Sequence, residues 1–185
     1  SQGHRLLGHT LFFGLSGFGF MLIEIVLMQK YQRFVGSPIY STIVILGGLL
    51  FFSGLGSFFS RNFSRKILIA CICAIPLLIL FQSFFVEDLF MMFAKYTFNQ
   101  KLFIASGLIF PLAFLMGIPF PHAMEQIKQD MSDEYATLMF GVNGVLATVG
   151  ASLSIFFNVT HGMDYTLMIG FVTYVAAIIL FIIIK

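Results

Sequence analysis

Long apolar segments dominate the chain, and short polar segments separate them. A run of about 20 apolar residues is long enough to cross the hydrocarbon core of a bilayer, which is about 30 Å thick. None of the runs alternates between apolar and polar positions as a barrel strand would. The pattern predicts an all-α polytopic membrane protein, a single membrane domain over residues 1–185. Its six transmembrane helices are expected at residues 7–29, 39–59, 67–86, 102–120, 136–158 and 165–184.

The connections between these runs are too short to hold a soluble domain. Residues 87–101 mix acidic and aromatic positions, which predicts a short stretch at the membrane interface. Residues 121–135 form the most polar connection. The chain begins at Ser1 rather than Met and ends one residue after the last apolar run, so we expect it to be part of a longer protein.

Basic residues predict the orientation in the membrane. Arg61, Arg65 and Lys66 gather in one short connection, and Lys and Arg are enriched in cytoplasmic loops. With six spans, both termini share the side of this connection. We therefore expect both termini to be cytoplasmic, residues 30–38 to lie outside, and the protein to reside in a bacterial inner membrane.

The composition excludes whole classes of protein. Hydrophobic residues make up 59% of the chain and charged residues only 10%, whereas soluble domains carry about 25% charged residues. A soluble enzyme, a secreted disulfide scaffold and a disordered tail are excluded. The net charge of +2 gives no reason to expect a nucleic-acid partner. No Ser/His/Asp or Cys/His set is apparent, so we expect no catalysis by this chain and no cofactor.

Glu24 is the one acid within an apolar run. An ionisable residue inside a membrane is a candidate functional site by default, and the alternative is a structural acid bonded to a neighbouring helix. Gly14 and Gly17 share its face, which favours close packing and an inward Glu24. Gln29 is a second polar candidate on this helix.

The depth of Glu24 in the membrane indicates its protonation state and its partners. No Lys or Arg lies at that depth, so we expect the carboxyl to be at least partly protonated and bonded to a hydroxyl or amide. The neutral groups expected at the same depth are Gln82, Ser106, Ser152 and Ser154.

Two prolines mark the end of the fourth run. Pro119 and Pro121 remove backbone hydrogen bonds and free carbonyl groups. This opening either binds a ligand or acts as a gate, or it is a plain helix stop. His122 and Glu125 make one His-x-x-Glu pair, which is too few ligands for a metal site.

Small residues form two stripes on the fifth run. Small side chains let helix backbones approach closely, and Asn143 can hydrogen-bond across helices. Together with Gly14 and Gly17, they exceed what six helices need among themselves, so we expect homo- or hetero-oligomers. The Gly144 stripe is Gly141, Gly144, Thr148, Ala151 and Ser152, and the Gly150 stripe is Asn143, Ala147, Gly150, Ser154 and Asn158.

The basic turn carries a resemblance. Residues 56–66 resemble the loop between helices 2 and 3 of the major facilitator superfamily, with Ser60 in place of the family's acid and Phe63 in place of its second glycine. The resemblance implies half of that fold, built as three plus three helices. Any short cytoplasmic loop is also basic, which is the alternative explanation. The matching positions are Gly56, Arg61, Arg65 and Lys66.

A second resemblance covers most of the chain. Several segments, in the same order, resemble the membrane portion of spermidine-synthase-like integral membrane proteins. That family joins such helices to an aminopropyltransferase-like domain, which has no counterpart here. The resemblance therefore implies a membrane module with packing glycines such as Gly54, and it does not imply polyamine synthesis. The segments are 17–29, 36–38, 52–57, 116–121 and 141–144.

Three functions remain open from the sequence. The first is a non-catalytic membrane subunit or anchor that packs within a larger assembly in the lipid bilayer. The second is a major-facilitator-like half-unit that needs a second six-helix half and moves a small solute, possibly a cationic, polyamine-like one. The third is the membrane domain of a spermidine-synthase-like enzyme. One intramembrane acid and abundant small residues favour the first.

Overall fold

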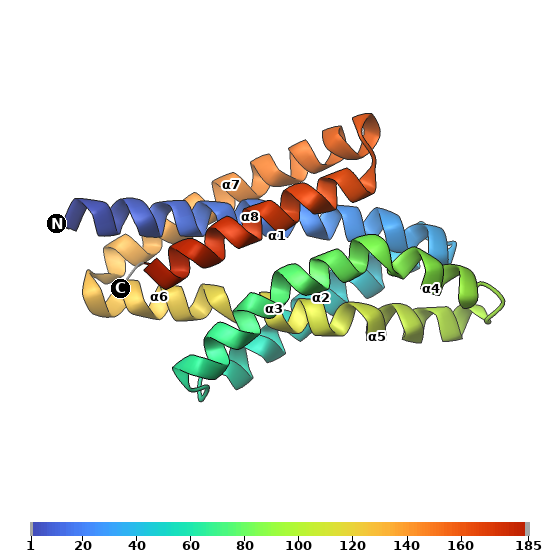
Figure 1. Cartoon of the computed structure of the whole chain (residues 1–185), viewed down its shortest axis with the longest axis horizontal. Coiled ribbons are helices and arrows are strands. Elements are labelled where there is room, and N and C mark those ends of the chain that lie inside the picture. Colours follow the sequence, from blue (N-terminus) through green and yellow to red (C-terminus); the bar gives the residue numbers. More distant parts are fainter. Residues whose placement is uncertain (1, 184–185) are drawn as a thin grey trace.

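A computed structural model describes the backbone of residues 2–183 and the side chains of residues 5–183. Within this part the chain is entirely helical apart from short connections (Figure 1). The six-span prediction is confirmed: α1, α2, α3, α5 together with α6, α7 and α8 are each long and apolar enough to cross a membrane. The helices are α1 (Gln2–Val35), α2 (Pro38–Ser60), α3 (Arg65–Phe84), α4 (Val86–Met92), α5 (Phe98–Met116), α6 (Pro119–Asp130), α7 (Asp133–Thr160) and α8 (Met163–Ile183).

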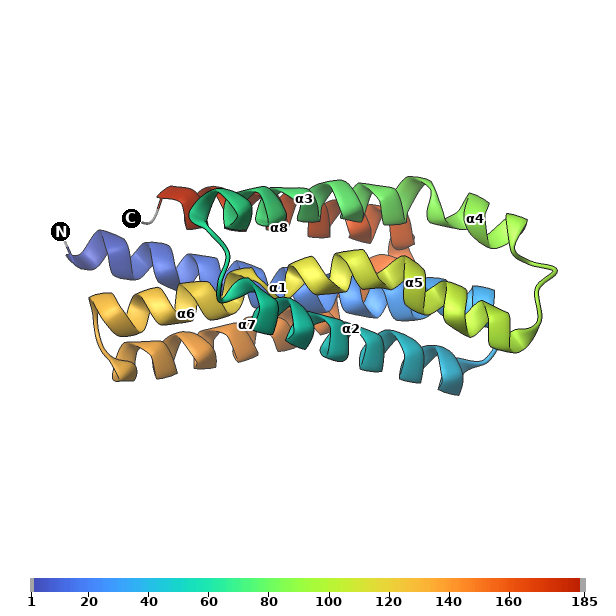
Figure 2. The same cartoon turned by 90° about the horizontal axis from the view of Figure 1, so that it is seen from below.

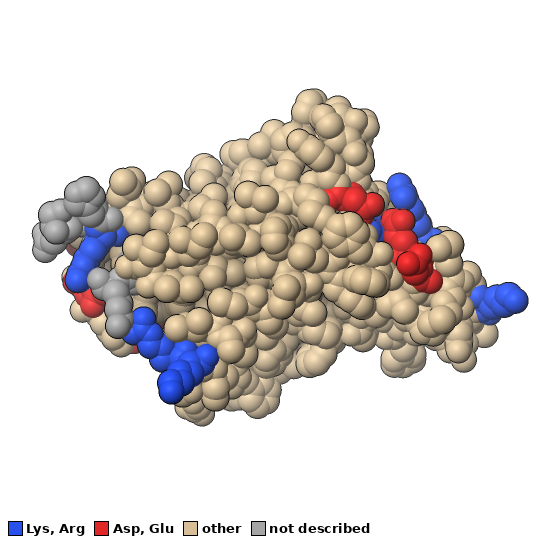
Figure 3. Space-filling model, in the orientation of Figure 1, with Lys and Arg blue, Asp and Glu red and all other residues tan. Residues whose placement is uncertain are grey.

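Charged side chains gather at the two ends of the bundle on the face that Figure 3 shows, and the middle of that face carries none. This distribution fits a protein whose middle lies in hydrocarbon. Both ends of the described chain lie at one end of the bundle, on the side of the α2–α3 and α6–α7 connections (Figures 1 and 2). Ile184, the last residue of the expected sixth span, and Lys185 after it lie outside the described residues.

Three helix boundaries differ from the predicted ones. The first helix continues to Val35, so Lys30 and Arg33 belong to it and the predicted helix end at residue 29 is wrong. Charged residues do not stop a helix; Gly36 does, with φ at 80° directly before Ser37 and Pro38. The expected polar connection at 121–135 is mostly α6, and the interfacial stretch contains α4.

The helices pack as two related groups of three. α1 runs along α7 and α8, while α5 runs along α2 and α3. The two groups correspond when the spans are shifted by three places along the chain, so that α1 corresponds to α5, α7 to α2 and α8 to α3. The α1·α7 contact then corresponds to α5·α2, and the α1·α8 contact to α5·α3. Because three spans reverse the direction of the chain, the two groups are inverted relative to one another, as the 3+3 prediction requires. α1 is the most enclosed span, with 56% of its apolar window buried, against 17% for α2 and for α7.

Glycines allow close backbone contact in two helix pairs, α1 with α7 and α2 with α5. A Cβ on Gly17 would overlap the backbone of Asn143, and one on Gly150 would overlap that of Phe18, so the α1·α7 contact needs both glycines. Gly56 against Phe114 and Gly117 against Ser53 play the same part between α2 and α5. Backbones that approach this closely gain dispersion energy along their whole length.

Candidate functional site

An apolar cavity of about 340 Å³ lies within the bundle. α1, α3, α5, α6, α7 and α8 all contribute to its wall. Four phenylalanine rings, Phe12, Phe20, Phe120 and Phe140, line it, and Ser16, Asn143 and Tyr174 are its polar side chains. Small-molecule sites usually have volumes of about 300–1,000 Å³ with apolar walls and a few placed polar groups. The cavity is therefore a candidate site for a small molecule.

Asn143 connects the cavity wall to the α1·α7 contact. Its Nδ2 donates to the Phe13 carbonyl oxygen at 2.9 Å and to Ser16 Oγ at 3.3 Å. Ser16 Oγ in turn donates to the Phe13 carbonyl at 3.0 Å. The predicted hydrogen bond of Asn143 across helices is confirmed, and it holds the amide at the edge of the cavity.

The two prolines begin a helix rather than end one. α5 ends at Met116, and Pro119 and Pro121 lie in the first turn of α6, where a missing N–H leaves no helical hydrogen bond unmade. His122 Nδ1 lies 3.0 Å from the carbonyl oxygen of Ile118, which satisfies one group at the break. Pro119 also lines the cavity, so the broken fourth span does border the candidate site.

Glu24 points into the bundle, as predicted from Gly14 and Gly17. It is 5% exposed, but among the described side chains it forms no hydrogen bond or ion pair. The expected bond to a hydroxyl or amide is therefore wrong. The proposed partners direct their donors to other groups: Ser106, Ser152 and Ser154 donate to backbone carbonyls, and Gln82 bonds Tyr31 and the Leu108 carbonyl.

Glu24→Leu is expected to leave the chain folded and at least as stable as the natural sequence, because no described group loses a hydrogen bond. Glu24→Gln is expected to fold as well. The midpoint of thermal unfolding in detergent measures both. A midpoint that falls for Leu but not for Gln would reveal a partner for the carboxyl and contradict this expectation.

The two stripes on α7 behave differently. The Gly150 stripe faces α1: Ser154 Oγ donates to the Leu22 carbonyl at 3.1 Å, and Asn158 Nδ2 donates to Gln29 Oε1 at 3.1 Å. The Gly144 stripe is largely exposed, and a Cβ on Gly144 meets nothing within 4 Å. Three of the predicted packing glycines face open space within the described part of the chain, and they are Gly54, Gly141 and Gly144.

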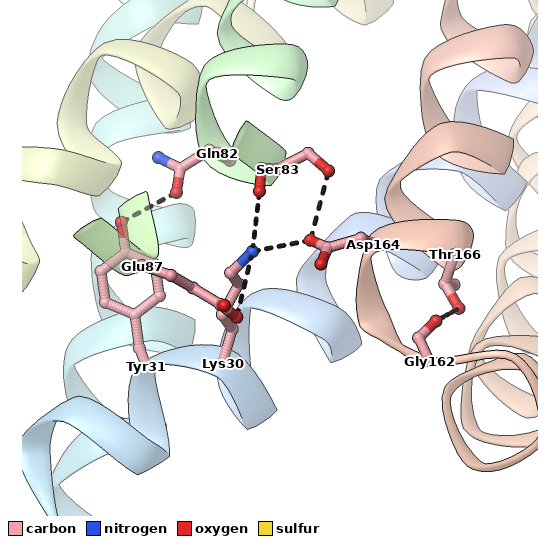
Figure 4. A network of polar contacts seen from close by, with 8 residues as sticks. All are labelled: Lys30, Tyr31, Gln82, Ser83, Glu87, Gly162, Asp164 and Thr166. Carbon is pink, nitrogen blue, oxygen red and sulfur yellow. Dashed lines mark hydrogen bonds and ion pairs between the residues drawn. The ribbon is translucent and has the colours of Figure 1, made fainter. Parts of the chain in front are cut away.

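A buried lysine near the C-terminal end of α1 joins four helices, and Figure 4 shows it among its partners. Lys30 is 1% exposed, and its Nζ lies 2.8 Å from Asp164 Oδ1 on α8 and 3.5 Å from Glu87 Oε1 on α4. It also donates to the Ser83 carbonyl at 3.3 Å, and Ser83 Oγ donates to Asp164. We call Lys30, Ser83, Glu87 and Asp164 the Lys30 cluster.

The sequence analysis missed the Lys30 cluster because it ended the first helix too early. Lys30 follows Ile23 by seven residues, which is two helical turns and the same face. Ile23 packs closely on Gly170 of α8. A helix continued as far as Gly36 would have placed Lys30 against the start of α8, where Asp164 is the first acid.

The remaining candidates lie at the surface. Arg61, Arg65 and Lys66 are exposed in the α2–α3 turn, and no ion pair to them is found within residues 5–183. Glu125 accepts a hydrogen bond from Gln129 and does not meet His122. No group of three or more metal-ligating side chains occurs in the described part of the chain.

Fold and site together define a class: a helical membrane protein of six spans with an apolar cavity lined by its helices and a buried lysine paired with two half-exposed acids at one end. No protein-family model, no curated protein and no solved structure matches this chain.

Proposed function

We propose that this chain is a non-catalytic integral membrane subunit that packs against a transmembrane helix of another polypeptide. The observation that carries the proposal is the contrast between the two faces of α7. One face buries the Gly150 stripe on α1, and the other presents the largely exposed Gly144 stripe, with no helix of the described residues covering Gly144.

The exposed stripe suits a second helix better than lipid. Its hydroxyls are satisfied within α7, since Thr148 donates to the Gly144 carbonyl at 3.0 Å and Ser152 to the Thr148 carbonyl at 3.1 Å. The face therefore offers close approach without an unpaired polar group. Small residues in a membrane promote association because they let backbones approach, whereas acyl chains gain little from them.

Gly144→Leu is expected to break the assembly without unfolding the subunit, because a Cβ at this position meets no described atom within 4 Å. The mass of the complex purified in mild detergent, measured by light scattering, reports this. Gly107→Leu on α5, where a Cβ also meets open space, is the matched control and should leave the complex intact. A monomeric natural chain, or a complex unchanged by Gly144→Leu, would contradict the proposal.

A transporter half-unit is the second candidate, and the inverted packing of the two helix triplets together with the cavity favours it. The residues that line the cavity include no Asp, Glu, Lys, Arg or His. This wall suits a neutral solute better than the cationic, polyamine-like one expected from the sequence. A role as the membrane domain of a spermidine-synthase-like enzyme remains a prediction from the resemblance.

The basic α2–α3 turn supports a cytoplasmic position for that end of the bundle, and a bacterial inner membrane as the location. Single cysteines at Asn62 and Asn99, exposed at opposite ends, distinguish the two orientations once Cys71 and Cys73 have been replaced. In intact cells a membrane-impermeant thiol reagent should label position 99 and spare position 62. The reverse pattern would invert the topology.

A further inference from the structure

Two polar groups in the cavity have no partner. Tyr174 on α8 is 4% exposed and lines the cavity, yet its hydroxyl makes no hydrogen bond to any described residue. Asn143 on α7 donates through Nδ2, but its Oδ1 accepts no hydrogen bond within residues 5–183. The cavity therefore presents one free hydroxyl and one free acceptor from two different helices.

Polar groups in protein interiors almost always find a hydrogen-bond partner, and neither of these two oxygens is so enclosed that a partner could not reach it. Here the cavity leaves room for that partner to come from a bound molecule. Gly19, whose missing Cβ would lie 3.1 Å from the Tyr174 ring, lets the ring sit close against α1. The position of the tyrosine thus depends on a close helix contact.

We propose that this cavity binds a neutral, planar ring molecule that carries a hydroxyl or carbonyl oxygen. The ligand is neutral because no charged side chain lines the wall. It is planar because the rings of Phe12, Phe20, Phe120 and Phe140 face the space, and aromatic rings pack favourably in stacked or edge-to-face pairs. Its oxygen bonds the Tyr174 hydroxyl, and a ligand hydroxyl can also donate to Asn143 Oδ1.

A lipid acyl chain is the competing occupant. It would fill the same volume, but it would leave both Tyr174 and Asn143 without a partner. The two occupants therefore predict different effects when only the tyrosine oxygen is removed. This inference does not depend on the proposed assembly, since the cavity lies within one chain.

The test uses the purified full chain in detergent, with 1-naphthol and naphthalene as matched probes that differ by one hydroxyl. The shift of the thermal unfolding midpoint with probe concentration gives the affinity. Tyr174→Phe removes the oxygen and orphans no described partner, so the variant is expected to fold. Tyr165→Phe, an exposed tyrosine on the same helix, is the control. Ala147→Phe fills the cavity from α7.

We expect 1-naphthol to bind more tightly than naphthalene to the natural chain and to Tyr165→Phe. Tyr174→Phe should lower the affinity for 1-naphthol about two- to tenfold, the usual effect of one neutral hydrogen bond, and leave naphthalene unchanged. Ala147→Phe should abolish binding of both probes. Equal affinities for the two probes, no effect of Tyr174→Phe, or binding that survives Ala147→Phe would each overturn the proposal. So would a phospholipid that co-purifies with the natural chain but not with Ala147→Phe.

Discussion

Gly150→Leu is expected to prevent stable folding of the chain. A Cβ at this position would lie 2.5 Å from the carbonyl oxygen of Phe18 and 3.0 Å from its Cα. These are backbone atoms, which cannot rotate away as a side chain can, so α1 and α7 would have to separate. Overpacking usually costs about 1–3 kcal/mol, and here it also disrupts the hydrogen bonds of Asn143 and Ser154 to α1. The yield of monodisperse protein in detergent measures the effect.

Two further variants make the comparison specific. Gly150→Ala adds only the methyl group and should lower the thermal unfolding midpoint while the chain still folds. Gly107→Leu adds a larger side chain on α5 where nothing lies within 4 Å, and it should behave like the natural protein. If Gly150→Leu gave normal yield and a normal midpoint, the close α1·α7 contact would be wrong.

The double variant Glu87→Gln with Asp164→Asn is expected to be destabilised. It leaves the ammonium group of Lys30, which is 1% exposed, without a carboxylate. The two carboxylates are themselves 52% and 59% exposed, so water screens part of the pair, and losing their charge-assisted hydrogen bonds should cost about 1–3 kcal/mol. Adding Lys30→Met removes the charge and should recover most of the stability, because Met has a similar length and needs no partner. Unfolding midpoints of the double and triple variants in detergent measure both effects.

The exposed pair Lys128–Asp133 provides the control for these variants. Its atoms lie 3.7 Å apart, with the side chains 50% and 89% exposed, and such surface pairs contribute about 0–1 kcal/mol. Asp133→Asn should therefore change the midpoint little. If the triple variant were no more stable than the double variant, the carboxylates would stabilise the fold through contacts other than Lys30.

The sequence by itself determined the spans and identified the small-residue faces of α1 and α7 that allow close helix packing. Six uncharged or nearly uncharged runs leave no other fold, since backbone polar groups in hydrocarbon must be satisfied within the helix. The Gly150 stripe could be predicted because small residues at helical spacing mark one face of α7. Asn143 was predictable for the same reason, as a polar group on that face needs a partner across the contact.

Only the tertiary structure decided which groups have partners. Glu24 points inward, as the glycines on its face predict. Whether a hydroxyl lies within reach of it depends on the rotation of the neighbouring helices. The hydroxyls of Ser106 and Ser152 bond carbonyl groups of their own helices instead. Lys30 meets Glu87 and Asp164, acids 57 and 134 residues away along the chain. The cavity with Tyr174 needs residues from six helices. Hydropathy patterns indicate which segments and faces are apolar enough to be buried in lipid or protein. They carry no information about the distance between two side chains on different helices.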